Sequence, residues 1–180
     1  VRGNRKYCVG RTLLRRSDKS RHHVLRGIFM AIRNILKDTE PLLRKKCRTV
    51  EQIDERVITL LDDMKETLAT ANGVGLAAPQ VGILKRIIIV DTGDEILELI
   101  NPVITKQSGH QDSFEGCLSV PGVRGHVDRP KKVTVQGYDR EGNLMEYKAQ
   151  DFVATIFCHE CDHLDGILFT DKATRLGQDD

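Results

Sequence analysis

Two histidines and a glutamate near the end of the chain form a pattern that can bind a metal ion. His159 and His163 are four residues apart, and Glu160 follows the first of them. Residues four apart lie on one face of an α-helix, so both imidazoles can bind the same cation. A bound metal lowers the pKa of a water molecule toward about 7, and the adjacent carboxylate can take its proton as a general base. The pattern therefore predicts metal-assisted hydrolysis.

A short pattern of this kind can also arise by chance on a solvated helix face. The neighbouring residues argue against that interpretation, because Phe152 and Ile156 fall on the same side of the helix as both histidines. We therefore expect this face to be apolar and buried. Buried imidazoles need polar partners, and one shared ion satisfies two of them.

A catalytic metal of this type usually has three protein ligands and one open position. No histidine follows His163, and the carboxylates there lack the spacing of the zincin proteases. The upstream candidates for the third ligand are Cys117, His110 and His126. Cys117 follows a glycine, which lets the backbone approach closely, and its thiol would ionise beside a cation. The residues favour Cys117 and leave the two histidines as alternatives.

Cys158 and Cys161 form a C-x-x-C pattern, which in other proteins binds zinc or carries out thiol redox chemistry. On a continuous helix these cysteines point away from His159 and His163, so they cannot share a metal with them. A redox pair would normally open a helix, where the helix dipole lowers the thiol pKa. We predict that both cysteines pack in the core.

Apolar periodicity predicts the helices that must carry these residues. One helix is expected over about residues 52–70, where apolar side chains recur at helical spacing until Asn72-Gly73 ends the pattern. A second helix should begin near Asp151 as its N-cap and end near Asp165, with Gly166 as the stop signal. This second helix would carry the histidine pair.

Runs of β-branched residues at 86–91 and 98–106 predict strands, and the segments 132–139 and 144–149 flank a turn at 140–143. Strands in this arrangement pair antiparallel, without helical crossovers. We therefore predict an α+β fold in which antiparallel sheets pack around the C-terminal HExxH helix.

The first 29 of the 180 residues differ from the rest in charge. They hold nine Lys or Arg against one acid, whereas the remainder carries a net charge of about −6. We expect 1–29 to be a basic extension that is disordered or foreign to the natural protein, and 30–180 to be a single catalytic domain. A transit peptide and an RNA-binding arm are the alternatives for the extension.

The composition excludes several classes of protein. No apolar stretch approaches the roughly 20 residues that a bilayer-spanning helix needs. An odd count of five cysteines, spread along the chain, is unlike a secreted disulfide framework and indicates a reducing compartment.

Three segments, in this order, resemble the signature motifs of the peptide deformylase family: GVGLAAPQ at 73–80, EGCLS at 115–119 and HECDH at 159–163. The resemblance covers residues 30 to about 170. It implies a hydrolase that removes the formyl group from the N-terminal methionine of newly made proteins. It further implies that Cys117, His159 and His163 bind one divalent metal, Fe(II) before Zn, Ni or Co, and that Glu160 is the general acid/base.

The same resemblance assigns an oxyanion site to the side chain of Gln80 and the backbone NH of Leu118, and it includes Gly75 in the catalytic motif. Glu115 and Arg129 are expected to pair and hold the loop. The residues assigned to substrate binding are Val74, Gly116, Arg124, Phe152, Thr155 and Ile156. Among these, Thr155 is more polar than a slot for a methionine side chain suggests.

The implied partners are N-formyl-methionyl nascent peptides and the ribosome near its exit tunnel, with no membrane. Docking through a long C-terminal helix is in doubt because the chain ends soon after Arg175. A monomer in the bacterial cytoplasm is expected rather than an organellar protein. The competing hypotheses are a zincin-like metallopeptidase, a structural zinc protein and a nucleic-acid binder that uses the basic extension.

Overall fold

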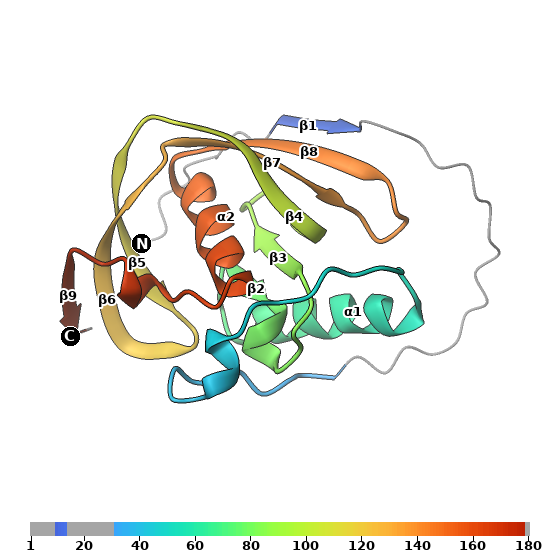
Figure 1. Cartoon of the computed structure of the whole chain (residues 1–180), viewed down its shortest axis with the longest axis horizontal. Coiled ribbons are helices and arrows are strands. Elements are labelled where there is room, and N and C mark those ends of the chain that lie inside the picture. Colours follow the sequence, from blue (N-terminus) through green and yellow to red (C-terminus); the bar gives the residue numbers. More distant parts are fainter. Residues whose placement is uncertain (1–9, 14–30, 179–180) are drawn as a thin grey trace.

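The structure, a computed structural model, describes residues 10–13 and 31–178 (Figure 1). Two antiparallel sheets and two long helices form the described part, which confirms the predicted α+β class. In the six-stranded sheet the order is β1 (Gly10–Leu13), β8 (Leu144–Gln150), β7 (Lys132–Tyr138), β4 (Ile96–Ser108), β3 (Ile87–Asp91) and β2 (Gly75–Ala77). The three-stranded sheet has the order β5 (Gln111–Cys117), β6 (Val120–Arg129) and β9 (Arg175–Gln178).

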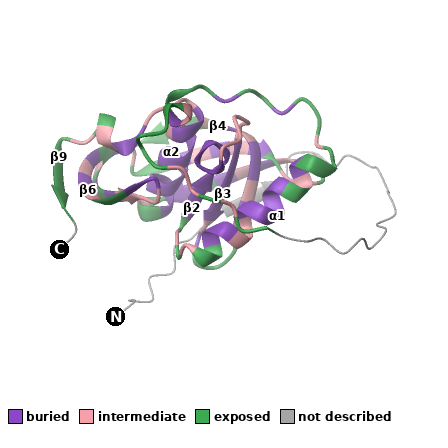
Figure 2. Ribbon diagram, turned by 90° about the horizontal axis from the view of Figure 1, so that it is seen from below, coloured by how far each residue is buried: buried purple, intermediate pink, exposed green. Residues whose placement is uncertain are grey.

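Both faces of the six-stranded sheet are covered near its centre, which explains the unbroken apolar run in β3. Ile88 and Val90 pack toward α2 (Asp151–Leu164), whereas Ile87 and Ile89 pack toward α1 (Glu55–Thr70). Successive strand residues point to opposite faces, so a strand covered on both faces is apolar throughout. Figure 2 shows this buried centre, with exposed residues on the outer side of α1.

Helix α1 begins three residues later than the sequence predicts. Asp54 is its N-cap, and the side chain accepts a hydrogen bond from the backbone NH of Val57 at 2.9 Å. The apolar positions before it had suggested an earlier start, but the cap decides where helical geometry begins. The predicted end at Thr70 is confirmed.

Helix α2 carries the histidine pair and ends as predicted. The NH of Gly166 donates to the carbonyl of His163, and the NH of Ile167 donates to that of Asp162. These two bonds form a Schellman motif, in which Gly166 has φ +76°. The prediction for the start is wrong, because Asp151 is the first helical residue, and the cap position before it makes no side-chain bond.

The four residues that the structure describes in the basic extension are ordered. Gly10–Leu13 form β1, which pairs antiparallel with the edge of β8 from Gly10 opposite Lys148 to Leu13 opposite Met145. This short part of the extension is therefore a strand. The rest of the expectation for 1–29 lies outside the described residues.

The hairpin of β5 and β6, which the sequence patterns did not reveal, lies beside α2 and carries Cys117 at the end of β5. The predicted strands at 86–91, 98–106, 132–139 and 144–149 correspond to β3, β4, β7 and β8. Short 3₁₀ helices are η1 (Pro41–Arg44), η2 (Ala78–Val81) and η3 (Phe169–Asp171). Within the described ranges, no helix has the length and apolar character needed to cross a membrane.

Candidate metal centre and substrate cleft

One cysteine and two histidines come together between β5 and α2. The potential ligand atoms of Cys117, His159 and His163 all lie within 4.8 Å of one another. Cys117 Sγ is 3.2 Å from Nε2 of His163. The alternative third ligands lie elsewhere, because the imidazole of His126 contacts Asp112 and that of His110 faces Asp128. The structure therefore selects Cys117 from the three candidates.

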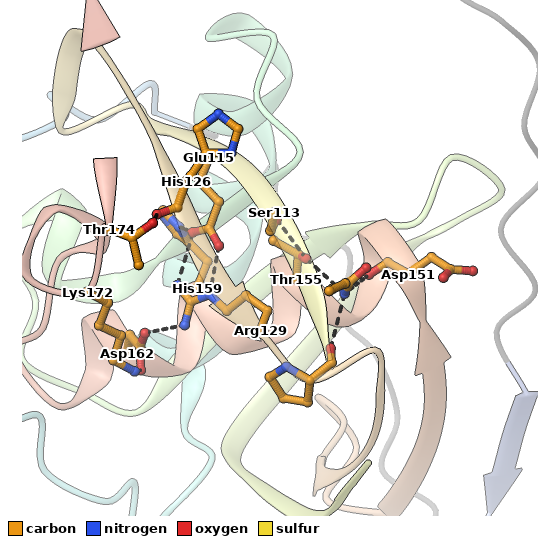
Figure 3. Close-up of polar contacts among 12 residues, drawn as sticks. Ser113, Glu115, His126, Arg129, Asp151, Thr155, His159, Asp162, Lys172 and Thr174 are labelled. Carbon is orange, nitrogen blue, oxygen red and sulfur yellow. Dashed lines mark hydrogen bonds and ion pairs between the residues drawn. The ribbon is translucent and has the colours of Figure 1, made fainter. Parts of the chain in front are cut away.

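Glu115 orients one of the two histidines. Its Oε2 lies 2.9 Å from Nδ1 of His159, which leaves Nε2 of that ring for a metal (Figure 3). The same carboxylate pairs with Arg129 through two hydrogen bonds of 2.7 and 3.0 Å, as predicted. Arg129 also donates to Asp162 at 2.6 Å, and Lys172 donates to the other oxygen of Asp162. A chain of charges thus runs from the buried ring to the surface.

The charges around the two rings favour a cation between them. Burial opposes a charge on His159, but its hydrogen bonds with Cys117 and Glu115 and the nearby Glu160 outweigh this and raise its pKa to about 10. Burial and the neighbouring His159 hold the pKa of His163 well below its usual 6.5. His163 is therefore a neutral nitrogen donor, and His159 lies in a negative field that attracts positive charge.

The donor set fits a transition metal. One sulfur and two imidazole nitrogens converge, and three protein ligands with an open position characterise catalytic sites. Among the described residues, the buried side-chain polar atoms that lack a hydrogen-bond partner are Glu160 Oε2 and His163 Nδ1. Such atoms are costly to leave unpaired in a protein interior, so Oε2 of Glu160, at the cleft, marks a place for a further ligand or water. Nδ1 of His163 is the ring nitrogen that does not face Cys117.

Glu160 lies directly against the backbone of β2. A Cβ placed on Gly75 would come within 2.2 Å of Oε1 of Glu160 and 2.9 Å of a methyl group of Ile156. Only glycine leaves room for this close approach. Burial raises the pKa of the Glu160 carboxyl to about 7, so it can gain and release a proton near neutral pH.

Gln80 is buried beside the cysteine and is not a surface amide. Its Oε1 accepts a hydrogen bond from the NH of Ala77 at 2.8 Å, which fixes the orientation of the amide. Its Nε2 lies 3.1 Å from Oγ of Ser119 and 3.5 Å from Sγ of Cys117. The amide nitrogen is thus held as a donor at the edge of the candidate metal site.

A cleft of about 520 Å³ opens onto His159, Glu160 and Cys117. Leu118, Gly75 and Gln80 also line it. The structure brings every predicted substrate residue to this cleft: Val74, Gly116, Arg124, Phe152, Thr155 and Ile156. The side chain of Arg124 packs over Gly116.

The expectation that Phe152 is buried is wrong. Its side chain is 41% exposed, whereas that of Ile156, one turn later, is only 4% exposed. Phe152 lies in the first turn of α2, and continuous burial of this helix starts at Val153. The helical period predicted the correct face of the helix, but it could not show at which residue along the helix burial begins.

Cys158 and Cys161 lie in the core, as predicted. Both belong to the cluster that packs α2 against the six-stranded sheet. Burial raises the pKa of the Cys158 thiol to about 11, so it stays protonated at neutral pH. Neither cysteine belongs to the group that could hold a metal.

Sequence reasoning missed several polar residues around the cleft. Glu115 was expected to contact only Arg129, although its position two residues before Cys117 in a strand places both on one face. Asp162 accepts a hydrogen bond from Arg129, a role that its place in the motif does not indicate. Lys37 lines the cleft and donates to the carbonyl of Leu118 at 2.9 Å, and no local pattern indicates that contact.

Comparison with known proteins agrees with this site. The polypeptide deformylase family model matches residues 32–179. A peptide deformylase of Acetivibrio thermocellus is 54% identical over 151 residues, which cover 84% of this chain and 89% of that protein. The crystal structure of peptide deformylase from Thermotoga maritima has a TM-score of 0.78 at 34% identity and covers 80% of this chain and 99% of that one.

A second similar structure is the Met-Ala-Ser-bound class I type b peptide deformylase from Acinetobacter baumannii. Its TM-score is 0.76 at 36% identity, and the match covers 80% of this chain and 99% of that chain. The matched range contains all three motifs, the candidate ligands and the cleft. By the family model and by its relatives, this chain is an enzyme that belongs to the polypeptide deformylase family.

Proposed function

We propose that this protein removes the formyl group from the N-terminal formyl-methionine of newly made proteins, with a metal ion held by Cys117, His159 and His163. The family to which it belongs acts on N-formylated nascent peptides. One observation carries the proposal for this chain: three donor atoms lie within 4.8 Å of one another at a cleft that Glu160 also lines, and Oε2 of Glu160 is buried without a hydrogen-bond partner. That combination is what hydrolysis of a formamide requires.

Fe(II) is the proposed ion, with Zn, Ni and Co as alternatives. A mixed sulfur and nitrogen donor set accepts all four, so the natural metal depends on supply as well as on the ligands. When bound, the ion supplies a Lewis acid and lowers the pKa of water. Glu115 supports this ligand set by holding Nδ1 of His159, so that Nε2 of the ring stays free.

Glu160 is the proposed general acid/base. Its carboxyl is buried and has a pKa of about 7, so it can take a proton from water during attack and return it to the leaving amine. The amide of Gln80 and the backbone NH of Leu118 are the proposed donors to the oxygen that becomes negative on the formyl carbon. The bond from Ala77 to Oε1 of Gln80 supports this role, because it turns the NH₂ group toward the site.

The cleft supplies a place for the rest of the substrate. Val74, Phe152, Thr155 and Ile156 are the proposed wall of the slot for the methionine side chain. The backbone of Gly116 and the side chain of Arg124 are the proposed contacts for the peptide main chain. A tripeptide that begins with methionine is therefore a suitable first substrate, as the Met-Ala-Ser-bound relative suggests.

The catalytic unit in this proposal is 30–180, as the family match to 32–179 supports, and 1–29 is not required for activity. We further propose that the enzyme acts as a monomer in the bacterial cytoplasm, on peptides emerging near the exit tunnel of the ribosome. The bacterial origin of its relatives supports this location.

The test is formate release from N-formyl-Met-Ala-Ser by protein purified without oxygen, beside Glu160→Gln and Glu51→Gln variants. Glu51 is exposed and lies outside the cleft, so its variant controls for loss of a carboxylate. We expect rapid release by the parent and the control, and a loss of about 10²- to 10⁴-fold in kcat for Glu160→Gln with the metal content unchanged.

No release by a parent preparation that holds one metal per chain would overturn the proposal. Cleavage of internal peptide bonds by that preparation would instead support the metallopeptidase. A metal that stays bound without any hydrolysis would favour the structural role.

A further inference from the structure

Two hydroxyl groups meet inside the wall of the substrate cleft. Thr155 of α2 lines the cleft, and its Oγ1 lies 3.0 Å from Oγ of Ser113 on β5 (Figure 3). Both side chains are buried, with exposed fractions of 4% and 9%. A slot made only for an apolar side chain would not need this pair, and a buried hydroxyl is costly unless it forms hydrogen bonds.

The Ser113–Thr155 pair has one more O–H donor than the hydrogen bond between the two residues uses. Two hydroxyls carry two O–H donors, and the bond between Ser113 and Thr155 takes one of them. The nearby amide of Gln111 cannot accept the other, because its Nε2 is itself a donor, 2.9 Å from the carbonyl of Asp151 and 3.3 Å from Oγ1 of Thr155. One O–H therefore has no acceptor among the residues that the structure describes.

No backbone carbonyl of α2 accepts a hydrogen bond from the Thr155 hydroxyl either. Thr59 and Thr67 of α1 each donate to the carbonyl four residues earlier, at 2.8 and 2.7 Å. This carbonyl is the usual acceptor for the hydroxyl of a threonine inside a helix. Thr155 makes no such bond, because its hydroxyl is turned to Ser113 on the neighbouring strand. Because Thr155 lines the cleft and Ser113 lies behind it, the unused donor is held in the cleft wall.

We propose that the Ser113–Thr155 hydroxyl pair donates a hydrogen bond to the sulfur of the first substrate residue, and so selects methionine over an isosteric hydrocarbon side chain. A thioether sulfur is a weak acceptor, whereas the methylene group of norleucine accepts nothing. With norleucine in the slot the buried donor stays unpaired, and sites built to hydrogen-bond a substrate discriminate against analogues that lack the partner.

This inference rests on the proposed deformylase activity and assigns a specificity role to Thr155. The experiment compares kcat/KM for N-formyl-Met-Ala-Ser and N-formyl-norleucyl-Ala-Ser, using the metal-loaded full chain. We expect the parent to prefer methionine by about threefold or more, the size of one modest hydrogen bond. Thr155→Val keeps the shape and removes the hydroxyl, so the ratio should fall to about one or below, because norleucine is the more apolar side chain.

Three further variants complete the test. Thr155→Ser keeps the hydroxyl and should retain the preference, whereas Thr155→Ala removes the hydroxyl without added bulk and replaces Thr155→Val if that variant does not fold. Thr134→Val, on β7 and outside the cleft, controls for the loss of a threonine hydroxyl elsewhere and should retain the parental ratio. Equal rates for both peptides in the parent, or a parental ratio in Thr155→Val and Thr155→Ala, would overturn the inference while leaving the deformylase activity established. If the parent released formate from neither peptide, the proposed deformylase function itself would be overturned.

Discussion

Oε2 of Glu115 lies 2.9 Å from Nδ1 of His159, across the gap between β5 and α2. The two residues are 44 positions apart in the chain. Because a carboxylate only accepts hydrogen bonds, Nδ1 carries a proton, and Nε2 is the ring nitrogen that can bind a metal once it gives up its own proton. This contact therefore sets which atom of His159 can bind a metal, and the pairing with Arg129 keeps the carboxylate in place.

Replacing Glu115 with Gln should weaken metal binding. The amide keeps the shape but loses the charge that holds the His159 tautomer, and changes of this kind typically cost about 10- to 100-fold in metal affinity. Competition with a chelator measures the affinity. Glu98→Gln is the matched control, since Glu98 is also a buried carboxylate paired with an arginine but lies outside the cleft. Equal affinities for the two variants would show that Glu115 has no orienting role.

Replacing Gly75 with Ala should reduce kcat much more than it reduces stability. The added methyl group would lie 2.2 Å from Oε1 of Glu160, so the carboxylate has to move. A displaced acid/base group should lose about 100-fold in kcat. Gly177→Ala is the control, because nothing lies within 4 Å of a Cβ built there. A kcat for Gly75→Ala within twofold of the parent would mean that the position of Glu160 is unimportant.

Removing the thiol of Cys117 should abolish the stabilisation that metal provides. A ligand that binds only the folded state raises the melting temperature, and the effect disappears when the site is lost. Thermal melts with and without a chelator should differ for the parent and for Cys158→Ala, whose thiol packs in the core. The Cys117→Ala melts should coincide. A chelator response retained in Cys117→Ala would indicate a different third ligand.

Glu98 should make stability depend on pH on the acid side. Although burial opposes its charge, hydrogen bonds from Arg140 and Lys65 hold its pKa below the usual 4.5. The folded state thus binds this proton less readily than the unfolded chain, so the stabilisation is complete above about pH 4.5 and is lost as the pH falls through the lowered pKa.

Urea unfolding of the parent and of Glu98→Gln measures this contribution. At pH 7 the parent should be more stable by about 1–3 kcal/mol, because the variant takes the charged acceptor from Arg140 and Lys65, which are both only partly exposed. Below about pH 4.5 the difference should shrink, since the parent then also has a neutral side chain at this position. A difference that stays constant down to pH 3.5 would contradict the assignment.

The histidine pair is an example of what the local sequence pattern can predict in this protein. The spacing of His159 and His163 needs only the helical period, and their neighbour Glu160 follows from the motif. Strands β3 and β4 likewise follow from runs of β-branched residues, and β7 and β8 from the turn signal that they flank. The hairpin of β5 and β6 escaped notice because charged and polar residues interrupt its apolar pattern.

By itself, the sequence was sufficient for the α+β class, the two helices that flank the sheet and the three motifs of the site. The sequence favoured Cys117 as the third ligand, and the tertiary structure brought it, rather than His110 or His126, to the histidine pair. Only the tertiary structure gave Glu115 a second partner, left Phe152 at the mouth of the cleft and joined Ser113 to Thr155. The physical reason is the same in each case. Helical and strand periods place a side chain on a face, but which side chains meet depends on how β5 packs against α2, between residues more than 40 positions apart.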